Sequence, residues 1–297
     1  GGDASSQAQS VVRDASGKAV WAQYAGARDR LSGNGNAAGF EATRSGLMFG
    51  TDMPLSSARP HGTRLGVMAG FTNGNVKVND RASASRVDSY TVGTYGTTPL
   101  GVSQTAGGGI QLRYGASYTW HSVSSKRDTA GLEEAEGRYK ANTAQLFTEA
   151  GMPFSLGRAT VEPYAGLAYA NTRRRAFNET GNAGLHADAA KQHLGYSTLG
   201  LRGQTRFDLK DGTQLALHGG AGWRHTYGKP TPVSRMRFAE GESFDVHGTP
   251  VARDAMLVEA GASVYADRGM RLSLGYAGQL ARGAQSHAIQ ANALWTF

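Results

Sequence analysis

The chain has 297 residues, among them 42 glycines, 8 prolines and no cysteine, and its formal net charge is +8. The lack of cysteine excludes zinc–thiolate sites, disulfide bonds and thiol catalysis, and no apolar run approaches the roughly 18 residues of a membrane-spanning helix. The length fits two ordinary domains or one large β domain, and because the basic residues are scattered, without a basic helix or an aromatic RNA-binding motif, we expect no nucleic-acid partner.

The first 18 residues, "GGDASSQAQSVVRDASGK", differ from the rest of the chain. They begin without Met and without the apolar core of a signal peptide, so we interpret the chain as a fragment or a processed product. Residues 3–14 could form about three helical turns, with Asp3 or Ser5 as N-cap. Such a helix is not stable alone in water, and plain disorder is the alternative. We therefore separate an N-terminal remnant, 1–18, from a folded domain, 19–297.

From residue 19 onward, apolar and polar side chains alternate, which is the period of a β-strand with one apolar face. Clear runs begin at Ile110, Thr160, Thr213, Met256 and Met270, and noisier ones near Val20, Phe40, Arg64, Tyr90, Tyr139 and Leu194. With the C-terminal run the total is about twelve strands, each near or above the roughly 10 residues that cross a membrane. Pro163 lies inside one run, where it costs a ladder hydrogen bond unless the pairing there is irregular.

The breaks between the runs alternate in length. Short breaks cover 54–62, 153–159, 210–212 and 267–269, and long ones cover 73–86, 123–137, 171–192 and 228–254. Short turns on one side and long loops on the other are typical of an outer-membrane barrel. The predicted fold is therefore all-β: a twelve-stranded antiparallel transmembrane β-barrel of the outer membrane, with short periplasmic turns and long extracellular loops. An even strand count places both ends of the barrel on one side, the periplasm.

The last run, "IQANALWTF", has an apolar face formed by every second residue, with Leu294 as an apolar exception on the other face. That face comprises Ile289, Ala291, Ala293, Trp295 and Phe297. We expect this strand to close the barrel against the first strand, because closure removes both sheet edges from lipid. Aromatic residues near strand ends predict membrane-interface girdles: Trp21, Trp120, Tyr169, Trp223, Trp295 and Phe297. The alternative is that Trp295 and Phe297 fill the core of a soluble β domain.

The opposite face of the strands carries charges of both signs. We expect these residues to line the lumen: Arg44, Asp52, Arg113, Glu149, Glu162, Arg202, Arg206, Arg224, Glu259 and Arg271. Buried charges must pair or stay hydrated, so they could brace the wall, form a hydrated lining along which a polypeptide slides, or do both. A twelve-stranded lumen should admit one helix, about 10–12 Å across, or an extended hairpin.

Several stretches together resemble a known family, the translocator (β) domain of type V secretion autotransporters. Residues 20–52 and "RLGVMAGFTNGNVKV" are similar to its first three strands, "VEPYAGLAYA" and "LGLRGQTRF" to later ones, and "ANALWTF" to its terminal strand. The order and spacing of these stretches, from Ala19 to Phe297, carry the resemblance. A serum-resistance or adhesin autotransporter is the subgroup that it suggests.

The resemblance implies an outer-membrane protein of a Gram-negative bacterium that exports its own N-terminal passenger to the cell surface. Residues 1–18 would be what remains of the passenger linker or pore helix. The terminal strand would be the signal read by the barrel-assembly machinery, with periplasmic chaperones as further partners, and the barrel would be a monomer. The chain has no Asn-Asn pair, and Gly275 and Ala277 stand where self-cleaving members carry glutamates, so we expect no cleavage inside the barrel by that route.

Two other functions stay open at this point. A porin is one, although porins use more strands. A barrel hydrolase is the other, but the eight histidines are scattered and no Gly-x-Ser-x-Gly occurs. We therefore expect no catalytic residue, no metal and no cofactor. Arg173, Arg174 and Arg175 follow a strand on the predicted outer side, and we hypothesise that they contact lipopolysaccharide phosphates, because arginine suits phosphate geometry; a solvated loop is the alternative.

Overall fold

The computed structural model describes residues 17–33, 38–56, 62–78, 83–101, 109–128, 134–181, 184–209, 213–229, 231–238, 242–247, 251–266 and 269–296. These residues form β-strands and their connections, without a helix. In this part of the chain no helical stretch has the length and apolar character needed to span a bilayer. The predicted N-terminal helix and Phe297 lie outside the described residues.

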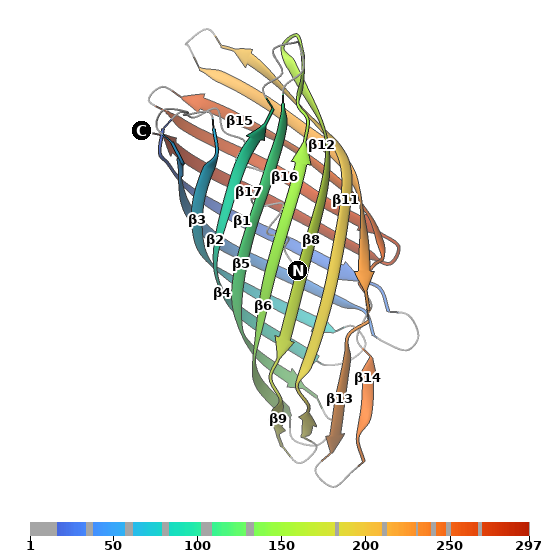
Figure 1. Cartoon of the computed structure of the whole chain (residues 1–297). Coiled ribbons are helices and arrows are strands. Elements are labelled where there is room, and N and C mark those ends of the chain that lie inside the picture. The colour runs from blue at the N-terminus through green and yellow to red at the C-terminus, as the bar shows by residue number, and fades with distance from the viewer. Residues whose placement is uncertain are drawn as a thin grey trace.

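Twelve long strands build one continuous antiparallel wall (Figure 1). They are β1 (Ala19–Leu31), β2 (Phe40–Pro54), β3 (Arg64–Val78), β4 (Ser83–Leu100), β5 (Ile110–Arg127), β6 (Ala135–Gly151), β8 (Ala159–Arg174), β11 (Ala190–Asp208), β12 (Gln214–Gly228), β15 (Asp254–Ala266), β16 (Met270–Ala281) and β17 (Ala284–Thr296). Five short strands accompany them: β7 (Phe154–Leu156), β9 (Phe177–Thr180), β10 (Leu185–Ala187), β13 (Val233–Phe238) and β14 (Phe244–His247).

The sheet closes because its first and last long strands pair with each other. The β1–β17 register runs from Ala19↔Thr296 to Leu31↔Ala284, while β1 also pairs with β2 and β17 with β16. The predicted closed twelve-stranded antiparallel barrel is confirmed. We call the end where β1 begins and β17 ends the terminal rim, and the opposite end the far rim.

Alternation of side chains gives the wall one apolar and one mixed face. Along β3, Arg64 and Met68 are buried, whereas Leu65 and Val67 are 41% and 55% exposed. A side chain buried in a single-layered barrel lies on the interior face, so the exposed leucines, valines and aromatics cover the outside. Two stacked sheets with an apolar core, the soluble alternative, are therefore excluded.

Four of the predicted girdle residues lie on the outer face, and one does not. Trp120, Tyr169, Trp223 and Trp295 are between 42% and 49% exposed, whereas Trp21 is only 4% exposed and belongs to an interior cluster. The prediction for Trp21 was wrong because "VWAQY" carries apolar residues on both of its faces. The same cluster explains Leu294, which packs inward with Trp21, Met48 and Met68 while its neighbour Trp295 faces out.

The predicted long breaks at 73–86 and 123–137 were wrong, since both are mostly strand. Residues 73–78 of β3 pair with 83–88 of β4, and 123–127 of β5 pair with 135–139 of β6. The break at 171–192 contains β9 and β10, and that at 228–254 contains β13 and β14. These four short strands pair as β9–β10–β13–β14 and extend the wall past the far rim, at the bottom of Figure 1.

Pro163 occupies the irregular pairing that the sequence requires. It lies on β8 opposite the point where β6 has ended at Gly151 and β7 has not yet begun at Phe154. The carbonyl of Pro163 accepts a hydrogen bond from the amide of Met152 (3.0 Å). The missing amide of proline therefore falls where the neighbouring strand is interrupted.

Candidate functional site: the barrel interior

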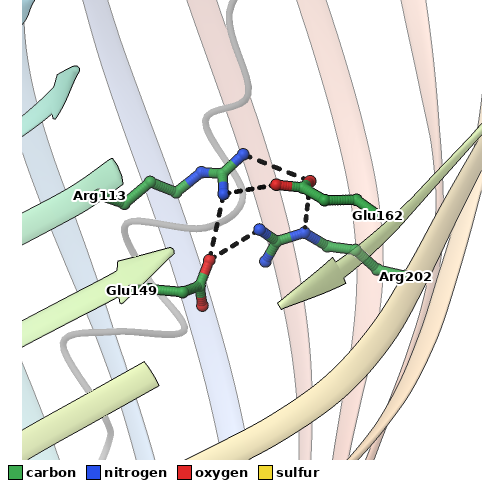
Figure 2. A network of polar contacts seen from close by, with 4 residues as sticks. All are labelled: Arg113, Glu149, Glu162 and Arg202. Carbon is green, nitrogen blue, oxygen red and sulfur yellow. Dashed lines mark hydrogen bonds and ion pairs between the residues drawn. The ribbon is translucent and has the colours of Figure 1, made fainter. Parts of the chain in front are cut away.

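A ring of four charged side chains, which we call the charged ring, lies on the interior face near the strand ends that form the terminal rim (Figure 2). Arg113 on β5 donates to Glu162 on β8 (2.7 Å) and to Glu149 on β6 (3.2 Å). Arg202 on β11 donates to the same two carboxylates, at 2.9 Å to Glu162 and 2.7 Å to Glu149. The ring therefore joins four consecutive strands of the wall and is neutral overall, with two arginines and two glutamates.

Glycines make room for this ring. Arg113 on β5 and Glu162 on β8 meet across the intervening strand β6, at Gly151, where a Cβ atom would overlap Glu162 Oε1 and lie 3.0 Å from Arg113 Nη1. Beside the ring, the guanidinium of Arg202 stacks 4.6 Å from the ring centre of Tyr164. The phenol of Tyr164 in turn covers Gly200, where a Cβ would lie 2.5 Å from its ring. Small residues on the wall thus let long side chains lie flat against it.

A second polar cluster lies inside the terminal rim. The indole of Trp21 donates to the hydroxyl of Tyr95 (2.6 Å), which donates to Asp52 (2.8 Å). Asp52 also accepts two hydrogen bonds from Arg64, at 3.0 and 2.7 Å. Arg64 donates further to the main-chain carbonyl of Gly17 (2.7 Å). The backbone directly before β1 is therefore held against the interior wall.

The remaining charged residues of the predicted lining form separate contacts. Arg206 and Arg271 lie 5.7 and 5.8 Å from the ring centre of Tyr265. Arg224 donates to Gln279 and lies over Tyr196, and Arg44 pairs with Asp29 at 3.3 Å. The predicted set thus divides into the charged ring, the cluster around Asp52 and these smaller contacts, rather than forming one site.

Glu259 lies beside the charged ring without joining its hydrogen bonds. A Cβ atom on Gly220 would lie 2.8 Å from Glu259 Oε1 and 3.1 Å from Arg202 Cβ. Glu259 is therefore a close neighbour of the ring on the β12–β15 side, where β12 pairs with β15 in register Gly220↔Glu259.

Sequence reasoning missed several interior partners. Tyr95, Tyr164 and Trp21 were not among the predicted lining residues, although Tyr95 and Tyr164 contact its charges and Trp21 bonds Tyr95. Tyr164 alternates in step with Glu162 on β8, so the period of two could have found it. Gln23 was also missed, and its side-chain amide donates to Gln290 (3.0 Å) across the closing seam.

The terminal strand presents its predicted apolar face to the outside. Ile289 is 62% exposed and Trp295 42% exposed, and Ala291 lies on the same outer face between them. Ala293 is half-buried. Among the described residues, no group of three or more histidine and carboxylate side chains could hold a metal ion.

Known proteins share this architecture. The translocator domain of the autotransporter NalP from Neisseria meningitidis superimposes with a TM-score of 0.77 at 17% identity, covering 99% of this chain and 93% of that one. The β domain of the Bordetella autotransporter BrkA gives 0.72 at 18% identity, covering 95% of this chain and 100% of that one. At these identities the likeness shows the fold.

Sequence similarity shows which family the chain belongs to. An extracellular serine protease of Serratia marcescens is 34% identical over 283 residues, which is 94% of this chain but 26% of that protein. The chain thus spans about a quarter of the length of this relative. Residues 20–277 match the family described as the autotransporter beta-domain, and the chain therefore belongs to the autotransporter β-domain family of outer-membrane barrels.

Proposed function

We propose that this barrel anchors a longer polypeptide in the bacterial outer membrane and exports the part upstream of it to the cell surface. In this arrangement the terminal rim faces the periplasm and the far rim faces the outside. The main support for the proposal is the contrast between the two faces: an apolar exterior encloses an interior that carries charges of both signs, several of them paired on the wall itself.

Such an interior suits a polypeptide in transit. The four charges of the charged ring neutralise one another, so they offer a passing chain a polar surface without a strong charge of either sign. A lining of this kind replaces part of the hydration of a peptide backbone, which apolar walls could not do. The charged residues of the predicted lining, from Arg44 to Arg271, then have one shared role.

The contact at Gly17 supports a route through the bore. Arg64, itself fixed by Asp52, holds the carbonyl of Gly17 on the interior side at the terminal rim (2.7 Å). The backbone therefore enters β1 from the interior side of the wall, at Gly17, and not from the lipid side. On this proposal residues 1–18 are the end of the linker that connects the exported polypeptide to the barrel.

Partners follow from the same proposal. The outward apolar residues of β17, Ile289, Ala291 and Trp295, together with Ala293 and Phe297, would be the feature that the barrel-assembly machinery reads, and periplasmic chaperones would carry the unfolded chain to it. We expect a monomeric barrel. The relative from Serratia marcescens is named as a serine protease, and we infer that any catalysis by the whole protein belongs to the upstream polypeptide, with none in the barrel.

Export is tested by placing a reporter polypeptide upstream of Gly1 and adding protease to intact cells. We expect the reporter to be degraded from the outside while the barrel stays protected. The control lacks residues 284–297, which removes β17 and the closing seam, and should expose no reporter. A folded wild-type barrel whose reporter stays inaccessible would contradict the proposal.

Single-channel recording separates a translocator from a porin. We expect the intact chain to conduct weakly or in flickers, and deletion of residues 1–16 to raise the steady conductance. Large, steady conductance of the intact chain that does not change on deletion would favour a porin. Hydrolysis by the purified barrel, abolished by a single histidine substitution, would instead assign catalysis to it.

A further inference from the structure

Four basic side chains form a compact group on the outer face, near the far rim. Arg138 and Lys140 lie on β6, Arg173 on β8 and Lys191 on β11, and all four are exposed. The three strands are consecutive neighbours in the wall, as Figure 1 shows. We call this group the basic patch.

Strand register brings the patch together. Arg173 is directly opposite Lys191 on one side and opposite Asn142 on the other. Directly opposed residues on one face have Cβ atoms about 4.5–5.5 Å apart. Lys140 and Arg138 continue from Asn142 along the same face of β6. Four positive charges thus occupy a small area, although like charges opposite each other destabilise a sheet.

The described residues provide no salt bridge to any of these four side chains. Glu136, the nearest carboxylate along β6, is bonded by Lys126 at 2.8 Å, and Lys126 also holds Glu134. The patch therefore keeps a local excess of positive charge.

On the opposite wall of the barrel, exposed arginines are paired with a carboxylate. There Arg28 and Arg30 on β1 share the carboxylate of Glu41, at 2.8 and 2.6 Å. Their side chains are 62% and 59% exposed. The exposed arginines of that wall therefore share a carboxylate, whereas the side chains of the basic patch form no ion pair with the described residues.

The patch borders the apolar surface. Trp120 lies in the same cross-strand row, opposite Asn142, and stacks edge-on against Tyr118 with ring centres 4.8 Å apart. On β8, Tyr169 precedes Arg173 on the same face and bonds the imidazole of His193 (2.7 Å). Aromatic girdles mark the level of lipid headgroups, so the basic patch lies at that level or just beyond it.

Of the hypothesised arginines, Arg174 does not share the outward face of Arg173. Arg173 faces outward in the patch, whereas Arg174 has the opposite orientation, stacks on Phe177 (5.3 Å) and Tyr139 (5.8 Å), and donates to the carbonyl of Asp188. The outer surface instead draws its charge from three strands that are distant in sequence.

We propose that the basic patch binds the phosphate groups of outer-leaflet glycolipid, of the lipopolysaccharide type. Charge complementarity and the aromatic border select a phosphate-bearing headgroup, since arginine and lysine both bind phosphate and the acyl chains would lie against Trp120 and Tyr169. The inference rests on the membrane placement proposed above, and it gives the barrel one wall that holds lipid more tightly than the others.

The test uses the full chain, folded in a zwitterionic detergent and titrated with fluorescent bis-phosphorylated lipid A. We expect R173Q/K191Q to bind about 30-fold more weakly than wild type, because each basic side chain at an anionic lipid surface contributes a factor of about five. The matched control is R28Q/R30Q, which removes two exposed arginines from the opposite wall, where both are paired with Glu41, and its affinity should stay within about twofold of wild type. R138Q/K140Q is the second variant, with a loss like that of the first.

Equal binding of lipid A by R173Q/K191Q and wild type would overturn the proposal, and so would equal binding of the dephosphorylated lipid by wild type. Full competition by inorganic phosphate at the lipid's own concentration would overturn it as well, because it would mean a site for free phosphate. Folding of each variant is checked by its heat-dependent gel mobility. Because export is measured separately, loss of lipid binding with normal reporter exposure leaves the proposed function intact.

Discussion

Replacement of Glu162 by Gln should destabilise the barrel, because this carboxylate is the meeting point of two buried arginines. Glu162 is 7% exposed and accepts from Arg113 at 2.7 Å and from Arg202 at 2.9 Å. Removing one partner from a buried ion pair costs about 3–5 kcal/mol. Since Glu149 stays bonded to both arginines, at 3.2 and 2.7 Å, we expect the lower end, about 3 kcal/mol.

The measurement is equilibrium unfolding in urea of the barrel in lipid vesicles, followed by tryptophan fluorescence. A loss of about 3 kcal/mol lowers the ratio of folded to unfolded protein by about 150-fold. The control is Glu41→Gln, which removes the same charge from a carboxylate with two arginine partners at the exposed surface. That change should leave the unfolding midpoint nearly where it is in wild type, because exposed ion pairs are screened by water.

A double substitution identifies the cause of the loss. In R113M/E162M the remaining ring residues, Arg202 and Glu149, still pair at 2.7 Å, so no charge stays uncompensated. We expect this double variant to be more stable than E162Q. An E162Q midpoint equal to that of the Glu41→Gln control would refute the reasoning, since it would mean that the ring is as hydrated as the outer surface.

Four further substitutions probe packing, with the same unfolding measurement. Gly50→Val should cost about 1–3 kcal/mol, because the new side chain would overlap the indole of Trp21. Gly26→Val should be tolerated, because its Cβ would lie 3.8 Å from the nearest atom, Tyr24 Oη. Equal losses of stability in the two variants would exclude steric overlap as the cause. Trp21→Ala should cost about 3–5 kcal/mol, since Trp21 is 4% exposed. Trp295→Ala, at a position that faces outward, should cost less, and the reverse order would place Trp21 outside the interior cluster.

The period of two was sufficient to predict the barrel, because every spanning strand must separate a lipid-facing side from an interior side. It also grouped Arg113, Glu162 and Arg202 on one face. It could not predict that Arg113 meets Glu162 across β6. That contact joins residues 49 positions apart, and it depends on the register of three strands and on the missing side chain of Gly151. The lining role of these residues stays a prediction.

The same signal failed where both faces of the sheet meet water. Beyond the girdle, residues 73–78 pair with 83–88, and Asn73 bonds Asp88 on the outer face. Polar residues there satisfy either face, so alternation disappears and the sequence resembles a loop. The short strands β9, β10, β13 and β14 were missed for this reason as well.

Closure of the wall by β1 and β17 has a consequence for how the molecule forms. Each strand contributes 13 residues to the seam, and the seam's contacts, such as that between Gln23 and Gln290, join residues 267 positions apart. Contacts this distant in sequence form late and slowly. Until β1 and β17 pair, the sheet has two open edges whose backbone amides and carbonyls have no hydrogen-bond partner, and hydrocarbon cannot solvate them. The barrel can thus enter the bilayer unaided only when it is almost closed. Any earlier insertion needs a temporary partner that pairs with the two open edges.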